Sequence, residues 1–288
     1  MLSLTIFTPT FNRKKTISRT YESLLRQQSV DFEWLIVDDG STDGTEYLIK
    51  QWKNEAPFLI RYIKQKNGGK YRAYNNGLRN ANGEMFFCVD SDDWLPNDSV
   101  RYILQIKKEL DSNEKLAGCI ALKEYKDKIL IGKIYPSNLK ISNLHNIERL
   151  GMNGERSLIF KTAVAKHFLF PEKTQEKFMT EAVVYDRYEK YDFLIKNKVL
   201  TTCEYQEDGL SCNPRKLMVK NPAGYKLYFA QRIDMAKSTL QRIKYVISYN
   251  AFRHIYKGRY FEYDGSHKIL VKVLSPFGKM LGMLYNRN

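Results

Sequence analysis

The sequence predicts an α/β protein built on a doubly wound, mostly parallel sheet that is flanked by helices. Two observations lead to this fold class. Over residues 1–120, short apolar segments alternate with amphipathic segments of helical period, as in βαβ units. Polar and glycine-rich clusters follow the apolar segments, where the carboxyl ends of parallel strands form a ligand-binding crevice.

The first four expected strands are separated by amphipathic helices. The strands are expected at residues 2–8, 34–37, 58–63 and 85–89, each a short apolar run. The helices are expected near 17–25, at 42–53, after Gly69 as far as about Ala81, and from about Asn97 to Leu110. This order predicts parallel strands joined by helical crossovers.

From about Leu116 the pattern becomes mixed. Further strands are expected at 116–122 and 128–134, where antiparallel pairing is an option, and at 157–160 and 199–205. One helix is expected from Thr162, and another at 180–190 with Thr180 as its N-cap. After Asn213 the chain is expected to be largely helical to about Ile255.

The composition is that of an ordinary soluble globular protein. Hydrophobic residues make up 43% and charged residues 27% of the 288-residue chain. No apolar run approaches the ~18 residues of a membrane-spanning helix, and residues 1–10 lack the basic region of a signal peptide. The four cysteines form no CxxC pair and no metal-ligand spacing with the four histidines. We therefore expect reduced, buried thiols in a cytoplasmic protein.

Positive charge is concentrated at the C-terminal end. The chain carries a net charge of +15, and residues 213–288 hold fifteen Lys and Arg against three Asp and Glu, which leaves +12 in this region. The first 212 residues are therefore close to neutral. A region this basic is expected to meet an anionic partner, such as a membrane surface, a nucleic acid or an acidic polymer.

Three carboxylates, Asp90, Asp92 and Asp93, follow the expected strand at 85–89. Like charges this close to a buried strand are costly unless they are paired or metal-bound. Asp90 and Asp92 alternate along an extended chain, so both can face one cation, and oxygen ligands suit Mn or Mg. The alternative is that residues 91–93 cap the following helix.

Two further polar clusters follow strands at the same edge. Asp38 ends a strand, where a carboxylate can accept the imino N–H of uracil or the hydroxyls of a ribose. The residues after it, 41–44, are equally consistent with turn and capping chemistry. The segment 68–70, Gly-Gly-Lys, with Arg72 beyond it, suits neutralisation of a diphosphate. A plain glycine turn and a solvated Arg72 are the alternatives.

The order of these clusters resembles that of the family 2 glycosyltransferases. The chain reads T-P-T-F-N-R at 8–13, D-D-G-S-T-D-G-T at 38–45, N-G-G-K at 67–70 and D-S-D-D at 90–93. The resemblance covers residues 1–120 and extends less specifically to about 212. It implies the GT-A fold, a Rossmann-like, mostly parallel sheet, here followed by a basic helical C-terminal extension. The implied parts are a nucleotide-sugar-binding half at 1–118, an acceptor-binding half of the same domain at 119–212, and a basic helical region at 213–288.

The resemblance implies a role for each matching residue. The nucleotide sugar is expected to contact Thr8, Pro9, Phe11, Asp38, Lys70, Asn76, Asp90 and Ser91. Pro9, Phe11 and Asp38 would flank and read the base, and Lys70 would lie near the base or the diphosphate. The ligands of a divalent metal, Mn or Mg, would be Asp92 and Asp90, with Asp93 as a third candidate.

Transfer with inversion needs a carboxylate that takes the proton of the acceptor hydroxyl. The resemblance places this base near the start of a helix in the second half of the domain, where Glu181 stands. The family often has Glu-Asp here whereas this chain has Glu-Ala, so Asp186, one turn further on, is the second candidate. Stabilisation of a helix N-terminus is the alternative role for Glu181. Glu155 is expected to pair with Arg156.

Two features near the C-terminus remain. Residues 205–211, Tyr-Gln-Glu-Asp-Gly-Leu-Ser, resemble a segment of bacterial polysaccharide glycosyltransferases and are interpreted as a loop over the site, or as an ordinary turn. Residues 268–288 place apolar side chains among lysines, a composition typical of an interfacial amphipathic segment. We expect this region to hold the protein at the inner face of the plasma membrane. Packing on its own domain is the alternative.

The sequence therefore predicts a metal-dependent, inverting glycosyltransferase. We expect its donor to be a nucleotide sugar, with UDP favoured, and its acceptor a hydroxyl of a growing, lipid-linked surface polysaccharide. A nucleotidyl- or phosphotransferase of similar fold is one alternative. In such an enzyme Glu181 would have no obvious catalytic role. A non-catalytic binder of anionic polymers is another. Against it, the carboxylate cluster would repel phosphates in the absence of a metal, and the basic tail lacks a nucleic-acid-binding motif, so no nucleic acid is expected.

Overall fold

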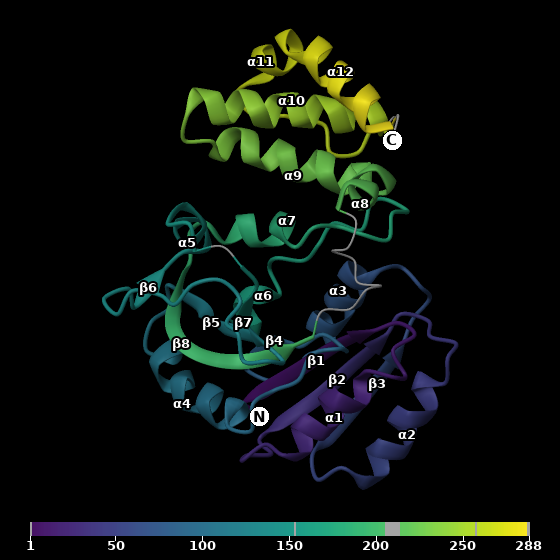
Figure 1. The fold of residues 1–288 in the computed structure, drawn as a ribbon, viewed down its shortest axis with the longest axis vertical. Helices are drawn as coiled ribbons and strands as arrows, with labels where there is room; N and C mark the ends of the chain where they lie inside the picture. The colour runs from purple at the N-terminus through teal and green to yellow at the C-terminus, as the bar shows by residue number, and fades with distance from the viewer. Residues whose placement is uncertain (1, 153, 205–213, 257, 287–288) are drawn as a thin grey trace. The chain divides into compact units, whose positions relative to one another are not determined.

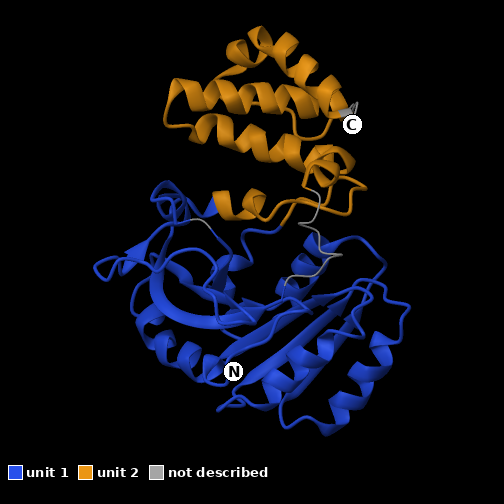
Figure 2. Cartoon of the chain, in the orientation of Figure 1, with its two compact units in different colours: residues 1–169, 187–205 blue, residues 170–186, 206–288 orange. Residues whose placement is uncertain are grey.

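The computed structural model describes residues 2–152, 154–204, 214–256 and 258–286. The chain forms two compact units, which Figure 2 colours separately: residues 1–169 with 187–205, and residues 170–186 with 206–288. The second unit thus includes a short segment from the middle of the chain besides the C-terminal region. The assignment of donor, acceptor and membrane binding to the segments 1–118, 119–212 and 213–288 stays a prediction.

The first unit is built on a sheet whose eight described strands lie in the order β3-β2-β1-β4-β7-β5-β8-β6 (Figure 1). The strands are β1 (Leu4–Thr10), β2 (Phe32–Asp38), β3 (Leu59–Lys64), β4 (Met85–Cys88), β5 (Leu116–Tyr125), β6 (Ile141–Ser142), β7 (Arg156–Lys161) and β8 (Asp192–Cys203). Strands β1 to β4 run parallel, and β8 is parallel to β5. Strand β7 is antiparallel to both its neighbours, β4 and β5, and β6 is antiparallel to β8. The expected α/β class is confirmed.

Helices cover both faces of this sheet. In the first unit they are α1 (Ile17–Leu25), α2 (Thr45–Glu55), α3 (Lys70–Asn80), α4 (Ser99–Asp111), α5 (Leu144–Arg149) and α6 (Thr162–Ala165). Apolar residues of α1, α2 and α4 join one hydrophobic core with alternate residues of the strands. Within it the rings of Tyr21, Trp34 and Trp52 stack with centroids 4.4–6.1 Å apart.

The opposite face of the sheet is covered by α3. The ring of Tyr74 on α3 packs edge-on against Phe7 of β1 and Phe86 of β4, with centroids 5.9 and 5.5 Å away. Phe7 points away from the core that its neighbour Ile6 joins, because successive side chains of a strand face opposite sides. Burial on both faces explains why these strands are continuous apolar runs.

The second unit is helical. It comprises α7 (Ala182–Tyr185), α8 (Pro214–Lys220), α9 (Pro222–Met235), α10 (Thr239–Ile255), α11 (Lys268–Val273) and α12 (Ser275–Asn286). Its core contains Ile233, Val246, Tyr249 and Val271. The largely helical region expected after Asn213 is confirmed. Within the described part of the chain, no helix has both the length and the apolar character needed to cross a bilayer.

Three expected elements differ from the structure. Residues 128–134 form no strand: a turn at Lys128, which has a φ of 68°, leaves one isolated bridge between Glu124 and Leu130. The helix expected at 180–190 shortens to α7 and a 3₁₀ turn, because the chain must return to begin β8. Thr180 is not its N-cap, since that position is Glu181. Strand β8 begins seven residues before the expected Val199, because Lys196 and Lys198 hide its apolar pattern.

Candidate active site

Three parallel strands bring their following loops together at one edge of the sheet. Thr10, at the end of β1, lies opposite Asp38, at the end of β2. The Asp39 N–H donates to the Thr10 carbonyl at 2.8 Å, and the Val89 N–H, just after β4, donates to the Phe7 carbonyl at 2.9 Å. The polar clusters that follow β1, β2 and β4 therefore leave the sheet as neighbours, as expected for the carboxyl ends of parallel strands.

Two of the expected donor-binding residues form an ion pair. The Lys70 Nζ lies 2.8 Å from each carboxylate oxygen of Asp90. Lys70 is the first residue of α3, and Gly69 before it has a φ of 96°, which favours glycine. Burial opposes ionisation of Asp90, yet the positive charges of Lys70 and Lys123 hold the pKa of Asp90 below its usual value. The structure thus joins the glycine-rich and D-x-D clusters.

The two other carboxylates after β4 have different surroundings. Asp93 is buried, and its carboxylate lies 3.0 Å from the Lys123 Nζ. Burial raises the pKa of Asp93 to about 7 although Lys123 opposes that rise. Asp92 forms no ion pair with any described residue, and burial together with the negative charge of Asp90 raises the pKa of Asp92. Asp92 is therefore the member of the cluster that no described residue holds in an ion pair.

The carboxylate cluster does not cap the helix that follows it. Helix α4 begins at Ser99, and its N-cap residue is Asp98, whose side chain makes no capping hydrogen bond. Instead the Asp93 N–H donates to the Asp90 carbonyl at 3.0 Å in a tight turn, and the Thr20 hydroxyl donates to the Asp93 carbonyl at 2.7 Å. This removes helix capping as the reason for three acidic residues at this position.

Lys123 is a site residue that sequence reasoning missed. It lies on β5, and its side chain is only 12% exposed, between Asp93 at 3.0 Å and Glu155 at 3.6 Å. The signal in the sequence was a lysine directly after the apolar run of residues 116–122. The expected pairing of Glu155 with Arg156 is wrong, because Arg156 donates to the backbone carbonyls of Ile131 and Lys133 and so closes the 131–133 segment onto β7.

Asp38 lies in the interior. Its side chain is fully buried, with Oδ1 accepting from the Ser41 N–H and Oδ2 from the Tyr62 hydroxyl, both at 2.7 Å. Burial, followed by the hydrogen bond to Asp38, raises the pKa of Tyr62. The carboxylate therefore holds the turn after β2 and ties it to β3. Its expected role in reading the base stays a prediction.

Asp39, which sequence reasoning did not select, holds the glycine-rich segment. Its buried carboxylate accepts from the backbone N–H groups of Gly68 and Gly69 at 2.8 and 2.7 Å. It also accepts from the side chains of Gln65 at 2.8 Å and Asn67 at 3.1 Å. One side chain thus joins the loop after β2 to the loop before α3, and so positions Lys70.

The remaining residues expected to contact the base lie on β1 and just beyond it. The Thr8 hydroxyl is buried and accepts from the Trp34 indole N–H at 3.0 Å, and Pro9 is buried as well. Phe11 is 47% exposed, and its expected contact with the base stays a prediction. Asn12, with a φ of 53°, accepts from the Thr42 N–H at 2.9 Å and so joins the first two loops.

Asn76 and Ser91 belong to the framework around these loops. The Asn76 amide donates to Gln65 at 2.9 Å, and Gln65 in turn donates to Asp39. Ser91 is buried. The guanidinium of Arg72 donates to the Gly68 carbonyl and lies 4.6 Å from the centroid of the Tyr71 ring. Arg72, in the first turn of α3, therefore binds the glycine-rich loop and is half-buried rather than a solvated surface charge.

The two candidates for the base lie in the second unit. Glu181 is exposed at the start of α7, and the Tyr185 hydroxyl donates to its carboxylate at 3.3 Å. Asp186 is only 4% exposed, and Arg232 donates to its two oxygens at 2.5 and 2.8 Å. This geometry gives Asp186 a structural partner. The segment 205–211 lies outside the described residues.

The chemistry of the carboxylates after β4 fits that of a divalent-metal site. Asp92 and Asp90 offer oxygen ligands, and the raised pKa of Asp92 marks a carboxylate that a cation would stabilise. No group of three His, Cys, Asp or Glu side chains in the described ranges is arranged to hold a metal by itself. Mg²⁺ commonly uses one or two carboxylates together with substrate phosphates, and Asp90 and Asp92 are two carboxylates of this kind.

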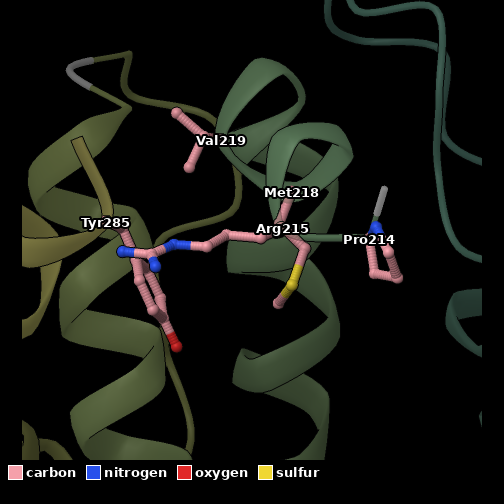
Figure 3. Close-up of a pocket in the computed structure, with 5 residues that line it drawn as sticks. All are labelled: Pro214, Arg215, Met218, Val219 and Tyr285. Atoms are coloured by element: carbon pink, nitrogen blue, oxygen red, sulfur yellow. The ribbon is translucent and has the colours of Figure 1, made fainter. Parts of the chain in front are cut away.

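Among the hollows in the described surface are two of similar size. One, of about 350 Å³, is lined by residues around the start of α2, including Ser41, Thr42 and Lys64. The other, of about 300 Å³, lies in the second unit, where Figure 3 shows the Arg215 side chain extending toward the ring of Tyr285. Neither hollow includes a residue of the Asp90–Asp93 segment. The candidate active site is therefore defined by its converging side chains and not by a hollow.

Comparison with known proteins matches this architecture to one family. The family model described as glycosyl transferase family 2 matches residues 5–167, more than half of the chain. That range includes the loops after β1, β2 and β4, the glycine-rich segment, and Lys123.

Among curated proteins, the chain is 30% identical over 135 residues to glycosyltransferase GlyA of Streptococcus pneumoniae, covering 47% of this chain and 17% of GlyA. It is 30% identical over 103 residues to the poly(ribitol-phosphate) β-N-acetylglucosaminyltransferase TarS of Staphylococcus aureus, covering 35% of this chain and 18% of TarS. It is 29% identical over 168 residues to the chondroitin synthase of Escherichia coli, covering 57% of this chain and 22% of that enzyme. The chain therefore spans only a minor part of these relatives.

Solved structures show the same fold at lower identity. TarS residues 1–349 in complex with UDP-GlcNAc superpose with a TM-score of 0.60 at 15% identity, covering 99% of this chain and 92% of that one. The mannosyltransferase PcManGT of Pyrobaculum calidifontis, in complex with GDP-Man and Mn²⁺, has a TM-score of 0.54 at 16% identity, covering 99% and 82%. These neighbours confirm the expected GT-A fold. With the match of the family model to residues 5–167, the chain belongs to glycosyl transferase family 2.

Proposed function

We propose that the protein is a metal-dependent, inverting glycosyltransferase that moves a sugar from a UDP-linked donor to a hydroxyl of a growing surface polysaccharide. The observation that carries this proposal is the convergence of Lys70, Asp90 and Asp92 at the carboxyl edge of the parallel strands. One lysine and two carboxylates at such an edge suit a metal–diphosphate, which needs both a cation and metal ligands.

The donor would bind across the loops of the first unit. Phe11, which is partly exposed, would stack on the base, and the loop that Asp38 anchors would read it. Asp92 and Asp90 would hold a divalent metal, which when bound would neutralise charge on the diphosphate leaving group. Lys70, placed by Asp39 through the glycine-rich loop, would supply a further positive charge close to the same phosphates.

Glu181 would act as the general base. It is exposed at the start of α7, so an acceptor hydroxyl can approach its carboxylate, whereas Asp186 already binds Arg232 through both oxygens. Glu181 would take the proton of that hydroxyl as its oxygen bonds to the anomeric carbon and the bond to the diphosphate breaks. Attack on the face opposite the leaving group inverts the configuration at that carbon.

The substrate class is proposed from the relatives. TarS is named as a poly(ribitol-phosphate) β-N-acetylglucosaminyltransferase, and another relative is a chondroitin synthase. The first name denotes N-acetylglucosaminyl transfer to poly(ribitol-phosphate) and the second denotes synthesis of chondroitin, and the TarS structures include complexes with UDP and UDP-GlcNAc. We therefore propose hexosyl or N-acetylhexosaminyl transfer from a UDP-sugar. The acceptor would be lipid-linked, with the basic C-terminal region holding the enzyme near the inner membrane surface.

A thermal-shift screen against UDP, GDP, CDP and dTDP, each with and without Mn²⁺, tests the donor site. A ligand present at ~100 Kd stabilises the folded state by about 2.7 kcal/mol. We expect the unfolding temperature to rise most with UDP and Mn²⁺ together. The Mn²⁺-dependent part of that rise should disappear in Asp92→Ala and remain in the control Asp111→Asn, which changes an exposed acidic residue on α4.

The screen can contradict the proposal in two ways. If none of the four nucleotides shifts the unfolding temperature, the edge of the sheet is not a nucleotide site. If UDP shifts it equally with and without Mn²⁺, and equally in Asp92→Ala, then Asp92 is not a metal ligand and metal dependence is wrong.

A further inference from the structure

The packing of α12 determines which of its sides faces water. Gly278 and Gly282 lie one turn apart and face α10: a Cβ at Gly278 would stand 2.2 Å from the Asn250 Cβ, and one at Gly282 would stand 2.9 Å from the Ala251 carbonyl oxygen. Only glycine permits so close an approach, so these two positions fix the side of α12 that is turned toward α10.

The opposite side of α12 is apolar. With 3.6 residues per turn, Phe277, Met280 and Leu284 lie roughly opposite the two glycines, and they are 55%, 60% and 50% exposed. On the preceding helix, Ile269 and Val273 share one face four residues apart and are 81% and 64% exposed. We call these five residues the α11–α12 strip.

Helices α11 and α12 expose more apolar side chains than surface helices of a soluble domain usually do. Single exposed apolar residues are common, but a helix of a soluble domain normally turns its polar face to water. Here two consecutive helices, which lie beside α10 in Figure 1, both leave apolar residues exposed. An arrangement of this kind marks a docking surface.

The charge around the α11–α12 strip indicates the partner. Lys268, Lys272 and Lys279 are exposed on the same two helices, and residues 265–288 contain no Asp or Glu. A second copy of this chain would bring the same lysines face to face, which opposes self-association. Apolar side chains bordered by lysines suit a lipid bilayer with an anionic surface, where the apolar groups enter the headgroup boundary and the lysines meet phosphates.

We infer that the α11–α12 strip docks the second unit on an anionic lipid bilayer, lying in its surface rather than crossing it. The inference goes beyond the sugar transfer proposed above and does not depend on it, because vesicle binding is measured without donor or acceptor. It also assigns the membrane contact to one side of two helices instead of to the basic region as a whole.

Flotation with vesicles of phosphatidylcholine, alone or mixed with the anionic lipid phosphatidylglycerol, tests the inference. We expect wild-type protein to float with the anionic vesicles, and Phe277→Glu to bind them at least ~10-fold more weakly because a charge replaces an inserted ring. The matched control is Val30→Glu, which changes an equally exposed apolar residue of the first unit, 55% exposed, and should bind like the wild type.

A second pair of variants separates charge from insertion. Reversal of Lys268, Lys272 and Lys279 to Glu should weaken binding by more than roughly 100-fold, since each lysine near an anionic surface contributes about 1 kcal/mol. The control reverses three exposed lysines of the first unit, Lys15, Lys53 and Lys108. Circular dichroism melts of all variants verify that they are folded.

Each outcome of these experiments either supports or contradicts docking of the α11–α12 strip on a bilayer. Absence of flotation with anionic vesicles, or equal loss in Phe277→Glu and Val30→Glu, would overturn it. Sedimentation equilibrium that shows a dimer lost in Phe277→Glu would also overturn it, because the occupant would then be a second copy. Loss confined to Phe277→Glu and to the three reversed lysines of α11 and α12 would establish it.

Discussion

Lysines hold two of the three carboxylates that follow β4. Lys70 lies on Asp90 and Lys123 on Asp93, whereas Asp92 pairs with no described residue. The two lysines lie on other elements, α3 and β5, so ion pairs with two different elements hold the Asp90–Asp93 segment. The buried pair of Lys123 and Asp93 adds little net stability as a pair, but removing one partner leaves an uncompensated charge in the interior.

Replacement of Lys123 by Met should therefore destabilise the protein. With the Lys123 and Asp93 side chains only 12% and 8% exposed, we expect a loss of about 3 kcal/mol of unfolding free energy, measured by urea denaturation. The control Lys126→Met removes a 67% exposed lysine paired with Glu204 and should cost less than ~1 kcal/mol. Equal losses in the two variants would show that Asp93 does not need Lys123.

At the scale of elements, two loops are held by single side chains. Asp38 closes the turn after β2, and Asp39 holds the glycine-rich loop before α3 through Gly68 and Gly69. The position of helix α12 depends on a different kind of contact, the close approach of Gly278 and Gly282 to α10. The glycine-rich loop and α12 are thus each positioned by a contact with a segment that is distant in sequence.

Asp39→Ala should loosen the glycine-rich loop. Hydrogen bonds to a charged group contribute about 1.5–3 kcal/mol each, so we expect the unfolding free energy to fall by roughly 2–4 kcal/mol. UDP binding, followed by calorimetry, should weaken as well, because Lys70 follows this loop. The control Asp31→Ala removes hydrogen bonds on the exposed surface near Ser3. Unchanged UDP affinity in a folded Asp39→Ala variant would contradict the role assigned to the loop.

Gly278→Ala tests the packing of α12 because the substitution can either stabilise or destabilise this helix. In a solvated helix this change stabilises by up to ~1 kcal/mol. Here the new Cβ would stand 2.2 Å from the Asn250 Cβ, so α12 must move and we expect net destabilisation. Hydrogen exchange of the α12 amides provides the measurement, with faster exchange as the expected result. Slower exchange would show that Gly278 does not face α10.

At the scale of the whole molecule, the predicted functions fall on different units. The side chains expected to bind the donor lie in the first unit, whereas Glu181, Asp186 and the α11–α12 strip lie in the second. Donor binding, proton transfer and membrane docking should therefore be separable by mutation.

Glu181→Gln should abolish transfer and leave donor binding intact. We expect turnover to fall on the order of 100-fold or more, because the general base is lost, while the stabilisation by UDP and Mn²⁺ stays unchanged. Asp186→Asn should instead lower stability through Arg232, by about 3 kcal/mol, and affect transfer only through folding. If Glu181→Gln retains full turnover and a folded Asp186→Asn does not, the base has been assigned to the wrong residue.

Local patterns were sufficient for the fold class. Strands β1 to β4 and their helices follow from apolar runs and helical periodicity, and the clusters at their ends follow from the rule for parallel sheets. The pattern failed at 128–134, where apolar residues form a loop closed by Arg156, and at the start of β8, where lysines interrupt the apolar run.

By itself, the sequence determined the α/β class, the order of the motifs, the concentration of positive charge near the C-terminus, and the candidates Asp90 and Asp92. Only the tertiary structure decided that Lys70 meets Asp90, that Lys123 meets Asp93, that Asp186 pairs with Arg232, and which side of α12 faces water. The reason is physical. Periodicity reports which face of a segment is buried, whereas ion pairs and close glycine contacts depend on which distant segment packs there.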